Sequence, residues 1–145
     1  MWFEDFHAGQ EFVSQRRTIT EADLVTFAGW SWDTNPVHTD ALGAAEGRYG
    51  APIAHGALGL SVALGLASRL GVFEESSVAL LGVDGWRFVA PVLVGDTVRC
   101  RVAILGTRLT SSGTTGVLRR AFTLTNQRDE VVQQGELALL VAVRP

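Results

Sequence analysis

Asp33 and His38 are the residues of this chain whose types and spacing best suit acid–base chemistry. They stand five positions apart in the run Asp33-Thr34-Asn35-Pro36-Val37-His38, and on one continuous helix that spacing would direct them to different sides. Pro36 interrupts such a helix and biases Asn35 towards extended geometry, so the two side chains can fold back to a common point. A carboxylate and an imidazole that reach one water molecule can act as a general acid–base pair.

His55 and Gly56 follow His38 by seventeen and eighteen positions and stand at the start of a long apolar segment. A histidine in front of a buried helix is as often a structural group as a reactive one, so we assign His55 to shaping a pocket. Asp33 has a structural alternative too, because Asp and Asn-Pro are common in turns and helix caps. The joint presence of Asp33, His38 and His55-Gly56 favours a reactive site.

Length and composition indicate a globular protein, and we expect one domain over residues 1–145. The net charge is −3 and the twelve basic residues, all arginines, are scattered along the chain, so we expect no nucleic-acid partner. Cys100 is the only cysteine, which excludes an internal disulfide and favours a cytoplasmic location. We expect it to behave as a small buried hydrophobe.

The segment Ala51 to Val72 is apolar enough to suggest a membrane span. It contains Pro52, His55 and Arg69, and its uninterrupted part is shorter than the roughly 20 residues that cross a bilayer. We therefore expect a buried helix and no membrane partner. The N-terminus has no signal-peptide pattern, so we expect the mature protein to start at or near Met1.

The helices that must position the reactive residues lie in the first half of the chain. Thr20 to Trp30 predicts a helix that leads towards Asp33, with Thr20 as the cap and Asp23 three positions on. Residues 33–38 are predicted as a loop, 39–46 as a short helix and 55–70 as the longest helix. The inner face of the first helix is predicted to carry Leu24, Phe27 and Ala28.

The helix predicted over residues 55–70 has small residues on one face. Gly56, Gly59, Leu60, Ala63 and Ala67 lie at helical spacing. Each interior glycine costs about 1 kcal/mol relative to alanine, so their accumulation indicates close packing against a neighbour. A curved sheet wrapped around the helix would provide that neighbour.

Strands dominate the second half. They are predicted over residues 78–89, 97–108, 114–125 and 130–143, after a first strand over 11–19. Val98, Cys100, Val102 and Ile104 alternate with more polar residues, which is typical of a half-buried strand. The order is strand, helices and then an antiparallel meander, so we predict an α+β fold with the long helix on one face of the sheet. We expect Trp30, Trp32 and Trp86 in the core.

The motif Asp33-Thr34-Asn35-Pro36-Val37-His38, together with His55-Gly56 at its spacing, resembles the signature of the MaoC-like dehydratases, the (R)-specific enoyl-CoA hydratases. The later segments Trp86 to Val92 and Val94 to Thr97 resemble a strand and a turn of that family. The resemblance covers about residues 9–143. It implies a hotdog fold, in which an antiparallel sheet wraps a long helix, and a homodimer or a dimer of dimers.

The resemblance also implies a reaction, the reversible addition of water to the trans-2 double bond of an acyl thioester. Asp33 and His38 would activate the water and manage the proton at the α carbon, with the division of roles left open. Asn35 would orient the loop, and the Gly56 N–H would polarise the thioester carbonyl, as helix N-termini can. The substrate would be an acyl-CoA or an acyl carrier protein thioester, and no cofactor is implied.

Two residues depart from the family pattern. Trp32 stands where glycine is common, and Leu64 stands where some members have a serine beside the pocket. Because both are larger than the residues they replace, we expect a short or compact acyl group, about four to six carbons.

Three other functions are compatible with parts of the sequence. A 3-hydroxyacyl carrier-protein dehydratase would keep the chemistry and change the carrier, and a non-catalytic subunit would be expected to lose the acid–base pair. A hotdog thioesterase is disfavoured because residues 56–70 contain no Asp or Glu. We expect no metal, because Asp33, His38 and His55 form no motif with short, fixed ligand spacing.

Overall fold

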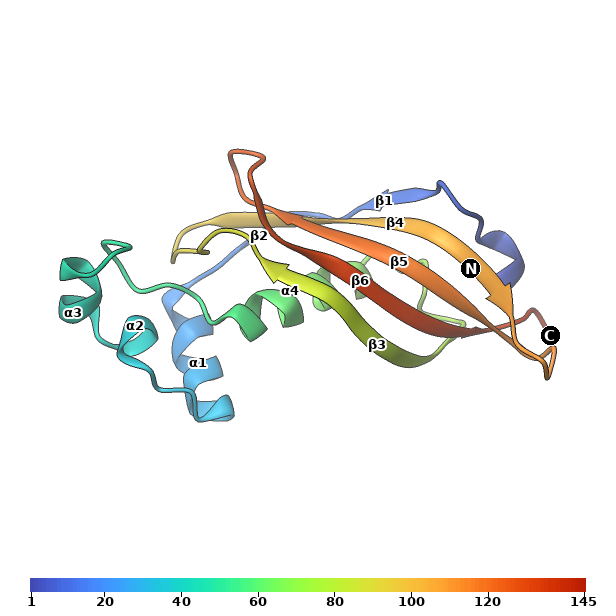
Figure 1. The fold of residues 1–145 in the computed structure, drawn as a ribbon, viewed down its shortest axis with the longest axis horizontal. Helices are drawn as coiled ribbons and strands as arrows, with labels where there is room; N and C mark the ends of the chain where they lie inside the picture. Colours follow the sequence, from blue (N-terminus) through green and yellow to red (C-terminus); the bar gives the residue numbers. More distant parts are fainter.

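A computed structural model describes all 145 residues as a curved antiparallel sheet with one long helix against it (Figure 1). The helical elements are a 3₁₀ turn at Phe3–Asp5 and the α-helices α1 (Glu21–Ser31), α2 (Pro36–Thr39), α3 (Ala41–Glu46) and α4 (Gly56–Ser68). The strands are β1 (Glu11–Val13), β2 (Arg17–Thr18), β3 (Ser77–Phe88), β4 (Thr97–Leu109), β5 (Thr115–Thr125) and β6 (Val131–Ala142). The predicted α+β class is confirmed.

The core lies between α4 and the inner face of the sheet. On β4 the predicted alternation is confirmed, because Val98, Cys100, Val102 and Ile104 are all buried. From α4, Leu58, Val62, Ala63, Leu66 and Ala67 join the same cluster. Burial raises the pKa of the Cys100 thiol to about 12, as expected for a cysteine that serves as a small hydrophobe.

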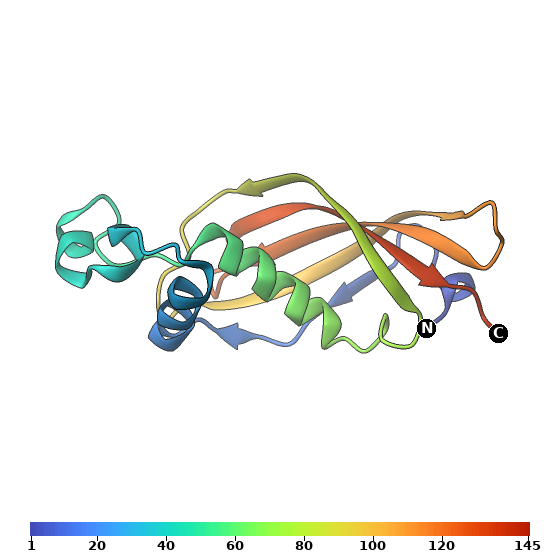
Figure 2. The ribbon, with the colours of Figure 1, turned by 90° about the horizontal axis from the view of Figure 1, so that it is seen from below.

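Figure 2 shows α4 lying along the sheet, while α1, α2 and α3 gather at one end of it. Helix α1 begins as predicted: Thr20 accepts a hydrogen bond from the Asp23 N–H and the Asp23 carboxylate accepts one from the Thr20 N–H. This capping box satisfies two backbone donors that a helix end would otherwise leave free.

The sheet order differs from a simple meander. Strands β4, β5 and β6 are consecutive neighbours, but β3 pairs with β6 at the far edge and the order is β1-β4-β5-β6-β3. Residues 89–96 connect β3 to β4, and eight extended residues span about 25 Å, enough to cross the roughly 14 Å of three strand spacings. The first predicted strand, 11–19, is two short strands, and both pair with β4.

Two further predictions were wrong. The segment 33–38 is not all loop, because Pro36 stands at the first position of α2, where a missing N–H costs nothing. Trp30 and Trp32 are 81% and 87% exposed and lie outside the core, whereas Trp86 packs against it.

None of the helices combines the length and the hydropathy that a membrane span requires.

Candidate active site

Asp33 lies two residues after the end of α1, directly after the C-cap residue. Trp32, the C-cap of that helix, has a left-handed backbone with φ of 64°, the conformation that favours glycine and ends helices. The Asp33 carboxylate accepts a hydrogen bond from the Asn35 N–H at 3.3 Å, which holds the turn between α1 and α2. The side chain of Asp33 remains 53% exposed.

Helix α2 carries His38. Asn35 is its N-cap and accepts a hydrogen bond from the Val37 N–H at 3.2 Å, directly before Pro36. These two residues start the helix whose last turn presents His38. Asn35 thus caps α2, and its roles in orienting the reactive loop and in contacting substrate stay predictions.

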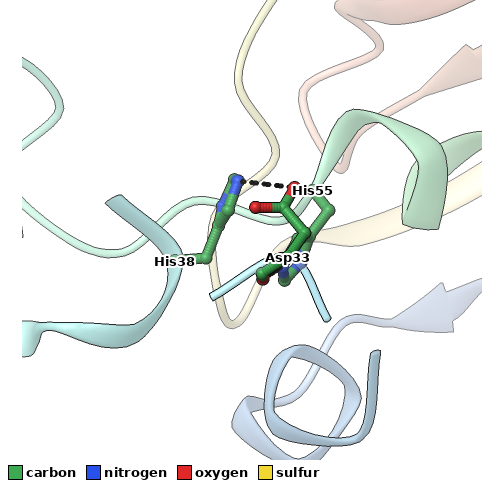
Figure 3. Close-up of side chains that lie close together, drawn as sticks. All are labelled: Asp33, His38 and His55. Carbon is green, nitrogen blue, oxygen red and sulfur yellow. Dashed lines mark hydrogen bonds and ion pairs between the residues drawn. The ribbon is translucent and has the colours of Figure 1, made fainter. Parts of the chain in front are cut away.

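A backbone carbonyl fixes the hydrogen on His38. Nδ1 of His38 lies 2.7 Å from the Ile53 carbonyl oxygen, and because a carbonyl only accepts, Nδ1 donates. In the neutral ring, Nε2 is then the unprotonated nitrogen. This atom lies 3.9 Å from Oδ2 of Asp33, as the dashed line in Figure 3 shows. The gap exceeds an ordinary hydrogen bond and leaves room for one water that binds both groups.

His55 supports both members of the pair. It is 2% exposed, and its Nε2 donates to the Asp33 backbone carbonyl at 2.9 Å. Its ring stacks on the ring of His38, with centroids 3.8 Å apart and planes at 26°. Figure 3 shows all three side chains gathered at one point, and the role of His55 in shaping a substrate pocket stays a prediction.

The N-terminus of α4 opens beside this cluster, since His55 is its N-cap residue and Gly56 its first helical residue. The Gly56 N–H makes no hydrogen bond within the chain. A Cβ on Gly56 would lie 2.8 Å from Cε1 of Phe88, so only glycine lets that ring lie so close. Figure 3 shows how the N-terminal turn of α4 begins next to His55.

Gln133 holds this end of α4 to the sheet. It is 3% exposed, donates from Nε2 to the Gly56 carbonyl at 3.1 Å and accepts from Nε1 of Trp86 at 3.1 Å. The sequence analysis missed this residue, because a glutamine in a strand carries no motif. The available signal was a polar residue at an inward-facing position of the strand, opposite the glycines of α4.

A cavity of about 520 Å³ opens beside His38, bordered by Leu24 and Ala28 of α1 and by Pro52 and Val94. Its lining is largely apolar, which suits an acyl or pantetheine chain. Trp32 does not border it. Leu64 does not border it either, so this cavity gives neither residue a part in limiting the acyl chain, and the expected length of four to six carbons stays a prediction.

Asp33, His38 and His55 offer ligand atoms within 4.8 Å of one another, a spacing that a metal ion could bridge. The stacking of the two imidazoles opposes this, because the in-plane lone pairs of stacked rings point alongside each other and do not converge. Nδ1 of His38 and Nε2 of His55 are also committed to carbonyl oxygens. The absence of a metal requirement stays a prediction.

Comparison with known proteins identifies the fold and the relatives. Residues 5–124 match the family model described as MaoC like domain. The chain is 36% identical over 105 residues to an (R)-specific enoyl-CoA hydratase of Rhodospirillum rubrum, over 72% of this chain and 70% of that protein. It is 39% identical over 101 residues to protein MaoC of Klebsiella aerogenes, over 70% of this chain but only 30% of that protein.

A solved Mycobacterium tuberculosis structure, described as a double hotdog fold, superposes with a TM-score of 0.90 at 24% identity. The match covers 100% of this chain and 45% of that one. The expected hotdog fold is confirmed.

Proposed function

Because this chain belongs to the MaoC-like domain family, we propose that it catalyses the reversible, (R)-specific hydration of trans-2-enoyl-CoA to (R)-3-hydroxyacyl-CoA. The observation that carries the proposal is the 3.9 Å approach of Nε2 of His38 to Oδ2 of Asp33 beside the N-terminus of α4. The R. rubrum relative is named for this activity. No cofactor is required.

In the proposed reaction one water binds between Asp33 and His38. Nε2 of His38 accepts a proton from this water, since Nδ1 already carries the ring hydrogen that bonds Ile53. The Asp33 carboxylate accepts a hydrogen bond from the second water hydrogen, which stays on the oxygen as the product hydroxyl, and it stabilises the imidazolium that forms. The water oxygen bonds to C3 of the acyl chain, and the pair returns one proton to C2.

The N-terminus of α4 assists this step by binding the thioester oxygen. As water adds to C3, negative charge develops on that oxygen in an enolate-like transition state. The free N–H of Gly56 and the partial positive charge of the helix end stabilise the charge. His55 holds Asp33 next to the start of α4, because its side chain bonds the Asp33 carbonyl and its backbone immediately precedes Gly56.

Both reactive groups come from residues 33–38 and approach the substrate from one side. The hydroxyl and the proton therefore add to the same face of the double bond. The configuration at C3 depends on which face the water attacks, and the (R) product is expected from the name of the R. rubrum relative.

Two alternatives use the same fold. A 3-hydroxyacyl carrier-protein dehydratase would use the same residues on a different carrier, and several relatives are named as dehydratases. An acyl-CoA thioesterase is less well supported, because α4 contains no carboxylate that could activate water on the thioester carbonyl.

The proposal is tested with crotonyl-CoA in a buffer that contains EDTA. We expect loss of the enoyl-thioester absorbance, no release of free thiol, and (R)-3-hydroxybutyryl-CoA on chiral analysis. Thiol release without loss of the double bond would indicate the thioesterase. An (S) product would overturn the proposed (R) specificity, and loss of activity in EDTA would overturn the metal-free mechanism.

A further inference from the structure

Arg120 breaks the pattern of the strand on which it lies. Along β5 the inward positions hold Leu118, Phe122 and Leu124, all buried, and Arg120 occupies the inward position between Leu118 and Phe122. It is 3% exposed. A buried guanidinium is costly unless an anion or several acceptors compensate it, so its presence in the core calls for a partner.

The chain supplies only part of that compensation. Nε of Arg120 donates to the Leu137 carbonyl at 3.2 Å, and no carboxylate lies within 4.0 Å of the guanidinium. The rings of Phe73 and Phe122 lie 4.9 and 5.1 Å from its central carbon and hold it by cation–π contact. The four N–H donors on its two terminal nitrogens form no hydrogen bond with the protein.

A cavity borders the side chain that carries these donors. Arg120 lines a space of about 400 Å³ between the second half of α4 and the first residues of β3. Its walls are mostly apolar and include Leu64, Ala67, Phe73 and Leu139. Burial lowers the pKa of Arg120 to about 10, so the guanidinium is still protonated at neutral pH. An apolar space that ends at one enclosed cation suits a ligand with an apolar stem and an anionic tip.

The proposed reaction site lies at the N-terminus of α4, and the cavity borders the second half of the same helix. Helix α4 starts at Gly56, and Leu64 is eight residues further on, about 12 Å at the rise of an α-helix. Strand β3 runs antiparallel to α4, as Figure 2 shows, with Phe88 near Gly56 and Val78 to Leu80 beside the cavity. A chain that is bound by its thioester at Gly56 and lies along α4 would bring its far end to the cavity.

We propose that Arg120 binds a carboxylate at the far end of the acyl chain, so that the substrate is the CoA thioester of an unsaturated dicarboxylic acid. This inference rests on the proposed hydratase function and specifies its substrate class. The planar guanidinium matches a carboxylate in a two-point hydrogen bond, and the apolar walls enclose the methylene groups.

One charged residue on the cavity competes with a substrate carboxylate. Glu74 lines the exposed side of the space, but its carboxylate forms no ion pair with Arg120. If Glu74 were the intended partner, the guanidinium would need no ligand. Glu74→Gln separates the cases: the proposal requires that the variant still prefers a diacid.

The first test compares substrates on the unaltered protein. Trans-2-enoyl-CoA thioesters of four to ten carbons are prepared in pairs of equal length that end in a methyl or a carboxylate group. We expect kcat/KM to favour the carboxylate member at its best length by about tenfold or more. A preference for the methyl member at every length would overturn this inference and leave the hydratase function intact. Turnover of neither series would overturn the hydratase function and, with it, the inference.

The second test uses variants of two neighbouring arginines. In Arg120→Met we expect kcat/KM for the diacid thioester to fall about 30-fold or more, as for loss of one partner of an enclosed charge pair, with little change for crotonyl-CoA. Arg119→Met is the matched control, because Arg119 lies on the outer face of the same strand and pairs with Glu136. It should leave both substrates unaffected.

Arg120→Lys keeps the charge without the planar fork and should show a smaller diacid-specific loss. Equal losses on both substrates in the Met and Lys variants would show a purely structural Arg120 and overturn the proposal. If Arg120→Met does not fold, the substrate comparison on the unaltered protein decides alone.

Discussion

At the scale of single residues, His38 is positioned by contacts that leave one nitrogen free. Its Nδ1 bonds the Ile53 carbonyl, its ring stacks on His55, and α2 sets its backbone. The side chain is 11% exposed, compared with 53% for Asp33. In the proposed reaction the enclosed imidazole therefore faces the substrate in a fixed tautomer, while the carboxylate is the more exposed partner.

Substitution of the pair tests this assignment. Asp33→Asn and His38→Ala should each lower crotonyl-CoA hydration about 10²-fold or more, the usual contribution of a positioned acid or base. The double variant should lose little more than either single variant, because both groups act on one water. His7→Ala is a control, since His7 is exposed on the surface. Near-normal turnover in either single variant would refute the acid–base assignment.

The sequence predicted the candidate residues but not the contacts that orient them. Asp33, His38 and His55 were predicted together and lie together. The hydrogen bonds that orient them are accepted by the backbone carbonyls of Ile53 and of Asp33 itself. Every residue has such a carbonyl, so the sequence does not show which ones are used. Arg120 was also missed. The sequence analysis considered only how the arginines are distributed along the chain, whereas the inward position of Arg120 follows from the register of β5.

At the scale of elements, the glycines of α4 have different roles. A Cβ on Gly59 would lie 2.1 Å from Nε2 of Gln133, the side chain that ties α4 to the sheet. At Gly65 on the same helix a Cβ would meet nothing within 4 Å. The close packing that the sequence predicted for the small residues of α4 is present at Gly59 and absent at Gly65.

These two positions give opposite predictions. Gly59→Ala should destabilise the fold by about 1–3 kcal/mol, because the methyl group displaces a buried, hydrogen-bonded glutamine. Gly65→Ala should stabilise it by up to about 1 kcal/mol through helix propensity. Urea unfolding of both variants measures the difference. A stabilised Gly59→Ala would show that Gln133 moves freely and does not hold α4.

Element boundaries in the second half were predictable because alternation marks half-buried strands, and β3 to β6 lie within two residues of their predicted ends. Strand order was not predictable in the same way. Both β4 and β6 offer apolar inner faces, and nothing local indicates which strand β3 joins. The pairing of β3 with β6 follows from the connection over residues 89–96 and from wrapping around α4.

At the scale of the whole molecule, β3 leaves one edge of the sheet open. It pairs only with β6, and its side chains Val78, Leu80, Leu81 and Val83 are 43% to 55% exposed. A long apolar edge of this kind invites pairing with another chain. Trp30, Trp32 and Leu42 are also more than 80% exposed on the helices at the end of the sheet. A single copy of the chain therefore leaves two apolar surfaces uncovered.

We accordingly predict a homodimer, or a tetramer of two dimers, with β3 at the interface. Sedimentation at micromolar concentration should show no monomer. Leu81→Asp should shift the protein towards the monomer, because a carboxylate at the centre of the edge would be desolvated without a partner. Leu109→Asp is the control: Leu109 is 49% exposed on β4, on the other side of the sheet order. A monomeric unaltered protein, or equal effects of both variants, would refute the predicted interface.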